Sequence, residues 1–352
     1  MRKLATIRIV KEILPIDGAD KIELAKIDGW QCVVGKGQFK VEDKGLYFEI
    51  DSALPIDDSR YEILIKNCRK CWRLGDKIIK ETLRIKTIKL KGQLSQGLLM
   101  PLNLYPEIQN PLLDTDYSEI LRVEHFDEVK EKYDAITGVA KLSGNAKGNF
   151  PSFIPKTDEE RIQNLTNYFK ENKEIEYEIT EKADGSSMTV YYSPKNKHED
   201  PLGVCSRNID LKDEEGNVFW RVAQQYNLLD TLPYLGREIA IQGELVGPGI
   251  NGNREQLTAH EYRVFRIWDI EKQCFVSPAE RYNICNELNL PHVRMISYPN
   301  KIFTQITSMD MMLEFVKGKT ASGTEREGLV FKAVDGSHSF KCINNEYLLK
   351  EK

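Results

Sequence analysis

Short segments in which apolar and polar residues alternate run through the first hundred residues. Four of them are LATIRIVKEI, KIELAKIDGWQCVVG, GLYFEIDSALP and RIKTIKLKGQLSQGLLMPL. Turn-forming sequences such as DGAD, GKGQ and EDKG separate them. Because successive side chains of a strand point to opposite faces, this pattern predicts short antiparallel strands with one buried face. Strands and turns at this spacing are typical of a small β-barrel.

The composition changes after this first segment. A length of 352 residues suggests two domains, at roughly 100–200 residues per domain. We expect an OB-type barrel over residues 1–100, a linker with a helical segment over 101–150, and a second domain over 151–352. The linker holds the acidic, helix-like piece EHFDEVKEKYD and the Gly-, Ser-, Asn- and Pro-containing stretch GVAKLSGNAKGNFPSFIP.

The second domain mixes helices with strands. A Thr-x-x-Glu capping pattern from Thr157 to Glu160 predicts that TDEERIQNLTNYFKENK is a helix. We expect strands in EIEYEITEK, SSMTVYYS, GREIAIQGELVG, YRVFRIWDI, EGLVFKAVD and SHSFKCIN, and helices in SPAERYNICNELNL and MDMMLEFVKGK. This mixture predicts an α+β class.

Charge is unevenly distributed along the chain. The net charge of −4 argues against a protein that coats nucleic acid non-specifically. Between Lys66 and Lys91, however, ten Lys or Arg residues stand against Asp76 and Glu81, with Trp72 inside the run. This run fits either a phosphate-backbone footprint or a solvated face without a specific partner.

The cysteine pattern and the lengths of the apolar runs indicate the cellular location. Seven cysteines are an odd number in a long chain, which favours free thiols, and Cys68 and Cys71 form a lone CxxC without a second pair at zinc-site spacing. The sequence has no apolar run of roughly 20 residues. We expect an intracellular protein, cytoplasmic or nuclear, without membrane association and monomeric.

The segment Lys182-Ala-Asp184-Gly185 places a lysine between a strand and a tight turn. Its amine can act as a nucleophile toward phosphorus only when deprotonated. An unperturbed lysine pKa lies near roughly 10.4, so the site has to favour the neutral amine by burial, a neighbouring cation or a metal ion. By itself, Lys-x-Asp-Gly is most often an exposed turn.

Motifs that follow in order change that balance. The chain resembles the covalent nucleotidyltransferase superfamily of RNA ligases, DNA ligases and mRNA capping enzymes. The resemblance implies a second domain of the nucleotidyltransferase (ATP-grasp-like ligase) type, built on antiparallel sheets with flanking helices. It also implies that Lys182 carries AMP and that Asp184 and Gly185 belong to the nucleotide site.

Further motifs of the superfamily match downstream of Lys182. VCSRNIDL resembles the element that contacts the sugar or the phosphate, through Arg207 and Asn208. IQGELVG implies a ribose or metal-water contact by Glu244, EREGLVFK a carboxylate of the metal shell at Glu327, and SFKCIN an α-phosphate contact by Lys341.

Two positions depart from the superfamily pattern. YRVFRIWDI resembles the strand whose aromatic ring stacks on adenine, which implies that role for Phe265, but Arg266 stands where relatives often carry Asp. The closing motif often has a second lysine where this chain has Ile343, so either Lys341 acts alone or Lys332 shares its task.

Two carboxylates near one phosphate would repel it unless a cation intervened. Glu244 and Glu327 therefore imply Mn²⁺ or Mg²⁺, held through bound waters. The resemblance to the superfamily implies ATP as the nucleotide.

Three segments are most similar to RNA ligases of the Deinococcus and Naegleria type, which place an OB domain first. They are the N-terminal region from DGADKIELAKIDG to DSALP, the segment PKTDEERIQN, and VCSRNIDLKDEEGNVFWRVAQQY. This resemblance implies that Arg161 contacts the ATP triphosphate and that the OB domain orients pyrophosphate or its metal, with Asp20 and Lys21 as candidates.

The expected function is an ATP-dependent RNA ligase that joins 3′-OH and 5′-phosphate ends through lysyl-AMP and an adenylylated 5′ end. Two alternatives remain open from the sequence. One is a non-catalytic OB protein that binds tRNA or another RNA, because the N-terminal segment also resembles tRNA-binding modules. The other is a GTP-using nucleotidyltransferase of the capping type, which the N-terminal place of the OB domain disfavours. The sequence does not distinguish nicked duplex RNA, an RNA–DNA hybrid and single strands as substrates.

Overall fold

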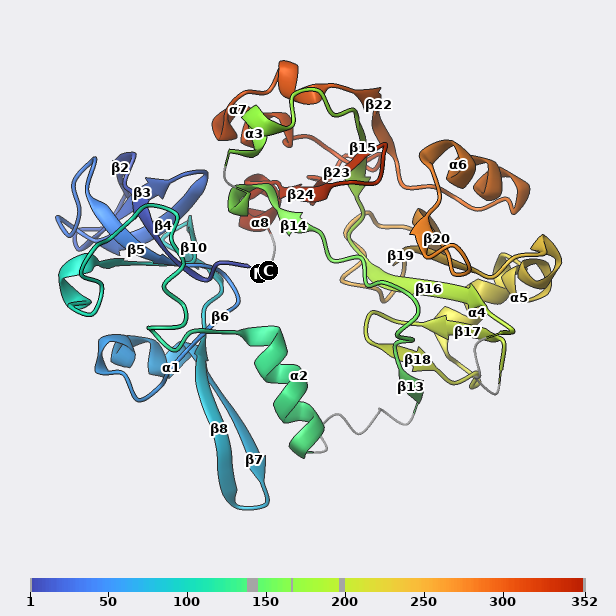
Figure 1. Ribbon diagram of the computed structural model, residues 1–352, viewed down its shortest axis with the longest axis horizontal. Coiled ribbons are helices and arrows are strands. Elements are labelled where there is room, and N and C mark those ends of the chain that lie inside the picture. The colour runs from blue at the N-terminus through green and yellow to red at the C-terminus, as the bar shows by residue number, and fades with distance from the viewer. Residues whose placement is uncertain (1, 138–144, 166, 196–199, 351–352) are drawn as a thin grey trace. The chain divides into compact units, whose positions relative to one another are not determined.

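The computed structural model describes residues 2–137, 145–165, 167–195 and 200–350. These residues form two compact units (Figure 1). Unit 1 comprises residues 2–137, 163–165 and 348–350, and unit 2 comprises 145–162, 167–195 and 200–347. Residues 138–144, which belong to the predicted linker, lie outside the described residues.

Unit 1 is built from short antiparallel strands. Their spatial orders are β1-β5-β11, β2-β3-β4, β10-β9 and β12-β6-β8-β7. The strands are β1 (Ala5–Ile9), β2 (Glu12–Pro15), β3 (Ile22–Ile27), β4 (Trp30–Gly35), β5 (Lys44–Phe48), β6 (Ser52–Leu54), β7 (Arg69–Leu74), β8 (Lys77–Arg84), β9 (Thr87–Leu90), β10 (Gln93–Gln96), β11 (Leu98–Pro101) and β12 (Glu124–His125). Helices α1 (Ile65–Cys68) and α2 (Phe126–Thr137) and the 3₁₀ turns η1 (Ser59–Leu64) and η2 (Leu102–Leu104) join them.

Alternating burial confirms the period of two predicted for this region. In β4, Trp30, Cys32 and Val34 are buried, whereas the residues between them are only partly covered. The ring centroids of Trp30 and Tyr47 lie 6.2 Å apart inside the barrel. The inward faces thus form the core of the OB-type barrel.

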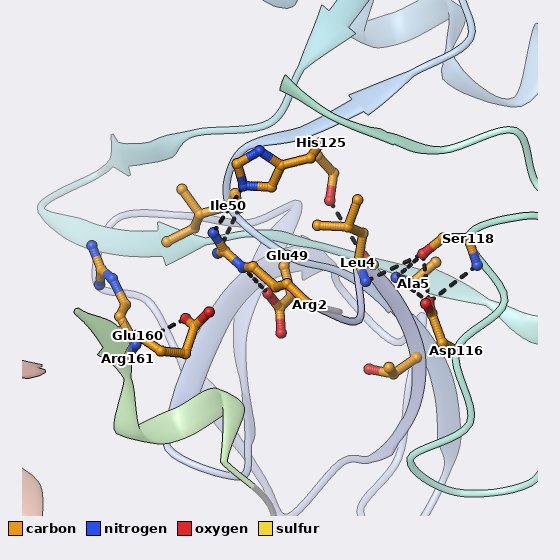
Figure 2. A network of polar contacts seen from close by, with 12 residues as sticks. Arg2, Leu4, Ala5, Glu49, Ile50, Asp116, Ser118, His125, Glu160 and Arg161 are labelled. Atoms are coloured by element: carbon orange, nitrogen blue, oxygen red, sulfur yellow. Dashed lines mark hydrogen bonds and ion pairs between the residues drawn. The ribbon is translucent and has the colours of Figure 1, made fainter. Parts of the chain in front are cut away.

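The residues before β1 are tied to the β5–β6 connection and to the chain that follows β11 (Figure 2). The Arg2 guanidinium lies 2.8 Å from Oε2 of Glu49 and donates to the carbonyl of Ile50 at 3.0 Å. The N–H of Leu4 donates to Oγ of Ser118 at 3.2 Å. These bonds satisfy polar groups that burial would otherwise leave without partners.

Unit 2 contains two sheets. One has the order β13-β18-β17-β16-β19-β20-β21, and the other has the order β14-β24-β23-β15-β22. The strands are β13 (Ala146–Asn149), β14 (Glu160–Arg161), β15 (Tyr177–Lys182), β16 (Ser186–Tyr192), β17 (Leu202–Cys205), β18 (Ile209–Leu211), β19 (Ile239–Val246), β20 (Glu261–Asp269), β21 (Cys274–Phe275), β22 (Met295–Asn300), β23 (Gly328–Ala333) and β24 (Ser339–Ile343).

Helices and 3₁₀ turns flank these sheets, and none of the helices that the structure describes is long and apolar enough to cross a bilayer. They are α3 (Tyr168–Glu171), α4 (Val218–Gln225), α5 (Leu228–Thr231), η4 (Leu232–Leu235), α6 (Pro278–Glu287), η5 (Ile302–Thr304) and α7 (Met309–Phe315). Two further elements, η3 (Ile162–Asn164) and α8 (Asn345–Lys350), each include residues of both units. Helices α2, α6 and α7 and the strands β23 and β24 confirm predictions from the sequence. The α+β class is also confirmed, and the sheets are antiparallel except for the parallel pairing of β14 with β24.

The turn at Asp184-Gly185 carries the chain from one sheet to the other. β15 ends at Lys182 in the five-stranded sheet, and β16 begins at Ser186 in the seven-stranded sheet (Figure 1). A Cβ atom on Gly185 would lie 2.3 Å from the carbonyl oxygen of Leu245. Only glycine allows this approach, which presses the turn against β19.

The predicted helix over TDEERIQNLTNYFKENK is wrong. The segment forms the short strand β14 and a 3₁₀ turn, and only α3 near its end is helical. The carboxylate of Glu160 accepts a bond from the N–H of Arg161 at 2.8 Å, and β14 pairs in parallel with β24. Pairing at a sheet edge, which local sequence does not encode, therefore overrides the capping pattern.

A buried ion pair joins helix α6 to strand β15 in unit 2. Arg281 of α6 pairs with Glu178 of β15, and their side chains are 4% and 0% exposed. Arg281→Met should lower the free energy of unfolding of unit 2 by about 3 kcal/mol, because the Glu178 carboxylate loses its principal partner inside the protein. Urea denaturation measures this change.

The control is Lys301→Met, which breaks an ion pair with Glu174 whose side chains are 47% and 82% exposed. That loss should be much smaller, because solvent screens an exposed ion pair. Equal effects of the two substitutions would contradict the assigned role of burial.

Candidate functional site

One face of the five-stranded sheet gathers the predicted cationic residues. Register places Lys182 opposite Gly328, Val330 opposite Lys341, and Arg161 beside Lys341. Residues opposite each other on neighbouring strands point to the same face. The sheet thus brings together Lys182, Lys341 and Arg161, which lie far apart in the sequence.

Lys182 is held by a carboxylate from the neighbouring strand. Its Nζ lies 2.7 Å from both Oε1 and Oε2 of Glu327, which directly precedes β23. The two side chains are 27% and 17% exposed. This bidentate, charge-assisted contact fixes the end of the lysine where a ligand can still reach it.

Glu244 enters the site from the seven-stranded sheet. It lies opposite Ser187 in the pairing of β19 with β16, and the Gly185 N–H bonds to its carboxylate. Burial raises the pKa of Glu244 to about 7, against the lowering effect of Lys182. Burial also raises the pKa of Glu327, although Lys182 again opposes the shift.

The charge on Lys182 follows from these neighbours. Burial alone would lower its pKa, but the carboxylates of Glu327, Glu244 and Asp184 outweigh burial and raise it. A nucleophilic lysine needs a lowered pKa, because only the neutral amine attacks phosphorus. In the site as described, the lysine is an ammonium paired with an excess of negative charge.

Lys341 and Arg207 meet at a shared acidic residue. Nζ of Lys341 lies 3.8 Å from Oδ1 of Asp158, and the Arg207 guanidinium forms an ion pair with the same carboxylate. Burial lowers the pKa of Lys341, and the charges of Lys182 and Arg161 add to this effect. Arg207 lies between β17 and β18 and is 61% exposed, which leaves it accessible to a substrate.

Asn208, the neighbour of Arg207, takes a different partner. Its Oδ1 accepts a bond from Nζ of Lys156 at 3.2 Å. Asp158, which links Lys341 to Arg207, was not among the predicted site residues, because an exposed acidic residue before β14 carries no distinctive pattern.

Phe265 sits in a β-bulge. Gln242 pairs with Arg266 and Gly243 pairs with Val264, so Phe265 is the extra residue of β20. A bulge re-aims its side chain relative to regular alternation. Nζ of Lys332 donates to the Phe265 carbonyl at 2.7 Å and lies 5.8 Å from the ring centroid.

Arg266 and Ile343, which depart from the superfamily pattern, are both accommodated by their surroundings. Arg266 pairs with Glu159 at 2.9 Å and its guanidinium lies 4.4 Å from the ring centroid of Phe275, so an arginine is accommodated on β20. Ile343 is 4% exposed and packs in the interior. Lys332 is engaged with the Phe265 carbonyl, whereas Lys341 faces Asp158.

Asp184 is held by residues that sequence reasoning missed. The Tyr347 hydroxyl donates to Oδ2 of Asp184 at 2.7 Å, and the Asn251 amide donates to Oδ1. The Arg254 guanidinium lies 4.0 Å from the ring centroid of Tyr347. Asn251 and Arg254 come from the β19–β20 loop and Tyr347 from α8, neither of which carries a recognisable motif.

The carboxylates near Lys182 are the candidate ligands of a metal ion. Among the described residues, no three His, Cys, Asp or Glu side chains are placed to coordinate one ion together. Two partly buried carboxylates with raised pKa values instead face a single lysine. This surplus of negative charge fits a divalent cation held mainly through water.

The OB candidates Asp20 and Lys21 lie in unit 1. Both are exposed, at the turn that leads into β3. The cysteines at 32, 68, 71, 205, 274, 285 and 342 are all free thiols.

A lysine at a strand end, facing carboxylates from two antiparallel sheets, follows an OB-type barrel along this chain. Together these features define the class of covalent nucleotidyltransferases. A family model described as RNA ligase matches residues 175–345, and a model described as an OB-fold domain matches residues 4–102.

Solved structures of the Naegleria gruberi RNA ligase are similar along almost the whole chain. A mutant with AMP and Mn is 38% identical, covers 99% of both chains and has a TM-score of 0.76. A mutant with ATP and Mn gives the same identity of 38%, coverage of 99% for both chains and TM-score of 0.76. The structure with pyrophosphate is 39% identical, with 99% of both chains covered and a TM-score of 0.74.

No curated protein matches the chain significantly. The structural relatives and the family model suffice: the chain belongs to the RNA ligase family. It is an RNA ligase enzyme rather than a non-catalytic OB protein.

Tyr347→Phe tests the support of Asp184. The substitution removes the hydroxyl that donates to Oδ2 but keeps the ring against Arg254. A hydrogen bond to a charged group is worth roughly 1.5–3 kcal/mol, so sealing of nicked RNA should slow by about tenfold or more. Single-turnover sealing rates measure the effect.

Tyr234→Phe is the matched control, because Tyr234 is 89% exposed. It should seal at the rate of the unmodified protein. Full sealing activity in Tyr347→Phe would show that Asp184 does not need this bond.

Proposed function

We propose that this RNA ligase is ATP-dependent and seals 3′-OH and 5′-phosphate RNA ends through an AMP carried on Lys182. The observation that carries the proposal is the placement of Nζ of Lys182 at 2.7 Å from both oxygens of Glu327, with Glu244 facing it from the other sheet. The Naegleria relatives with AMP, ATP and Mn support the choice of nucleotide and metal.

The proposed reaction has three balanced steps. Nζ of Lys182 gives up a proton and attacks the α-phosphorus of ATP, so that a P–N bond forms and the bond to pyrophosphate breaks. A 5′-phosphate oxygen of RNA then attacks the same phosphorus, the P–N bond breaks and the lysine regains a proton. Finally the 3′-OH loses its proton and attacks the 5′-phosphate, which releases AMP and leaves a phosphodiester.

The surrounding residues suit the charges that develop. Lys341 and Arg161 lie on the same sheet face as Lys182, where they would offset negative charge on the phosphates. Phe265 would stack on the adenine, and Arg207, 61% exposed, would receive the 5′-phosphate end. Asp184 and Gly185 shape the turn against Glu244.

Glu327 and Glu244 would hold Mn²⁺ or Mg²⁺ mainly through water. When bound, the cation supplies positive charge that favours the neutral amine of Lys182 and offsets charge on the α-phosphate. Glu327 also has a role of its own, because it holds the lysine Nζ in one position.

Labelling with nucleotide tests the proposal directly. The protein is incubated with Mn²⁺ and α-labelled ATP or GTP, and the denatured chain is examined for label that is acid-labile and alkali-stable. We expect label from ATP and none from Lys182→Ala. Label from GTP alone would indicate a capping-type enzyme, and no label from either nucleotide would refute the mechanism.

Two further substitutions probe the site that surrounds the lysine. Glu327→Ala and Lys341→Ala should abolish AMP transfer to Lys182, because each removes a charge beside the reacting groups. Retention of full labelling by either variant would show that its motif has been misplaced.

The pKa of Glu244 predicts a pH dependence of AMP transfer. Because burial raises this pKa to about 7, the carboxylate ionises as the pH rises through about 7, and only the ionised form attracts the cation. The rate of labelling should therefore rise across this range, and its midpoint should fall as the Mn²⁺ concentration increases. A midpoint that does not move with Mn²⁺ would point to another group, such as Lys332, whose pKa burial lowers to about 7.

We propose further that the protein acts on RNA as a monomer inside the cell. Free thiols at all seven cysteines fit a reducing compartment. Light scattering coupled to gel filtration tests the monomer, and a mass near 40.5 kDa is expected. Twice that mass would contradict it.

A further inference from the structure

The β7–β8 hairpin of unit 1 concentrates positive charge that the reaction site does not use. Figure 1 shows it extending as a long ribbon away from the barrel. Between residues 69 and 84 the chain carries six Lys or Arg residues against Asp76 and Glu81. Because the whole chain has a net charge of −4, this hairpin is a local exception.

Half of these cations already have partners. Arg84 pairs with Asp51 at 2.7 Å, Arg69 pairs with Glu81, and Lys80 pairs with Glu124. These three pairs tie the hairpin to itself and to the rest of unit 1. Arg69, Lys80 and Arg84 could bind a ligand only if these ion pairs broke.

The other three cations are Lys70, Arg73 and Lys77. All three are exposed, and within the described part of the chain none of them forms an ion pair. Lys70 and Lys77 share one face of the hairpin with Trp72, and Arg73 lies on the other face. Positive charge is therefore presented along both faces toward the tip.

A rigid base supports this presentation. Trp72 is 8% exposed and its ring centroid lies 6.1 Å from that of Phe126 and 5.9 Å from that of Tyr133. Its Nε1 donates to Oδ1 of Asp134 at 2.7 Å. The tryptophan is thus committed to the packing of α2 and does not stack on a base.

The tip is a two-residue turn formed by Gly75 and Asp76 between Leu74 and Lys77. Gly75 has a φ of 60°, which glycine adopts without strain. This turn closes the hairpin, and the register of the two strands shifts once, between Trp72 and Arg73.

Fixed, unpaired cations on an extended hairpin suit a polyanion better than a compact ligand. Each Lys or Arg that neutralises a phosphate releases condensed counterions, which supplies sequence-independent affinity. A ligase that seals ends of varied sequence needs contacts of this kind. The backbone of RNA is the polyanion that this enzyme meets.

We propose that the β7–β8 hairpin binds the phosphate backbone of the RNA substrate through Lys70, Arg73 and Lys77. This inference rests on the proposed function, because it takes RNA ends as the substrate. Within the hairpin part of the basic run, the paired cations and Trp72 are structural, and these three residues form the nucleic-acid contact.

The test compares two triple variants of the full chain. One carries Lys70→Ala, Arg73→Ala and Lys77→Ala. The control carries Lys170→Ala, Lys173→Ala and Lys319→Ala, which removes three exposed lysines of unit 2 and the same net charge. Binding to a 5′-phosphorylated nicked duplex RNA and to single-stranded RNA is measured without ATP by fluorescence anisotropy over a series of KCl concentrations.

The hairpin variant should bind RNA roughly tenfold more weakly or worse, and its plot of log K against log salt should be shallower by about 2 to 3. Roughly 0.9 per lost contact is expected for a duplex and roughly 0.7 for a single strand, so the slopes also indicate which form the hairpin contacts. The control should retain the affinity and the slope of the unmodified protein.

Labelling of Lys182 by ATP separates this proposal from the proposed function. Both triple variants should label fully, which also shows that they fold. Unchanged RNA affinity in the hairpin variant would overturn the hairpin proposal alone. If the hairpin variant lost binding to anionic lipid vesicles but kept its affinity for RNA, the hairpin proposal would also be overturned. If the unmodified protein failed to label with ATP, the proposed function itself would be overturned.

Discussion

The contact between Lys182 and Glu327 is the interaction on which the site depends. It joins the end of β15 to the residue that precedes β23, and its bidentate geometry leaves the lysine Nζ one position, 2.7 Å from both carboxylate oxygens. Glu244 approaches the same pair from the other sheet. Two antiparallel sheets thus meet around one cation and a surplus of carboxylates, and the Asp184-Gly185 turn that links them is part of the site. Chemistry and architecture share the same residues.

The carboxylates around Lys182 favour its protonated form, whereas the proposed reaction needs the neutral amine. The ammonium is stabilised by its acidic neighbours, yet a nucleophile must be neutral. A metal ion that shares Glu327 and Glu244 would weaken the hold of those carboxylates on the lysine proton. ATP would then bring negative charge toward Lys341 and Arg161, whose own repulsion and burial depress the pKa of Lys341.

Sequence reasoning recovered the barrel, the α+β class and most strands, because alternation and turn residues are local signals. Register then brought Lys182, Glu244, Glu327 and Lys341 together, although no local pattern encodes which strands pair. The same limit explains the failure at residues 157–173, where edge pairing of β14 replaced a helix, and the missed residues Tyr347, Asn251 and Arg254, which a loop and a terminal helix deliver to Asp184. Arg266 departs from the superfamily pattern, and its ion pair with Glu159, far away in the sequence, could not be predicted from local sequence.

The most direct test is to locate the covalent bond. The protein is incubated with ATP and Mn²⁺, digested, and its peptides are sequenced by tandem mass spectrometry under conditions that preserve a P–N bond. The account predicts a mass increase of one AMP on the peptide that contains Lys182, and on no other peptide. AMP on Lys332 or Lys341 with Lys182 unmodified would contradict the account.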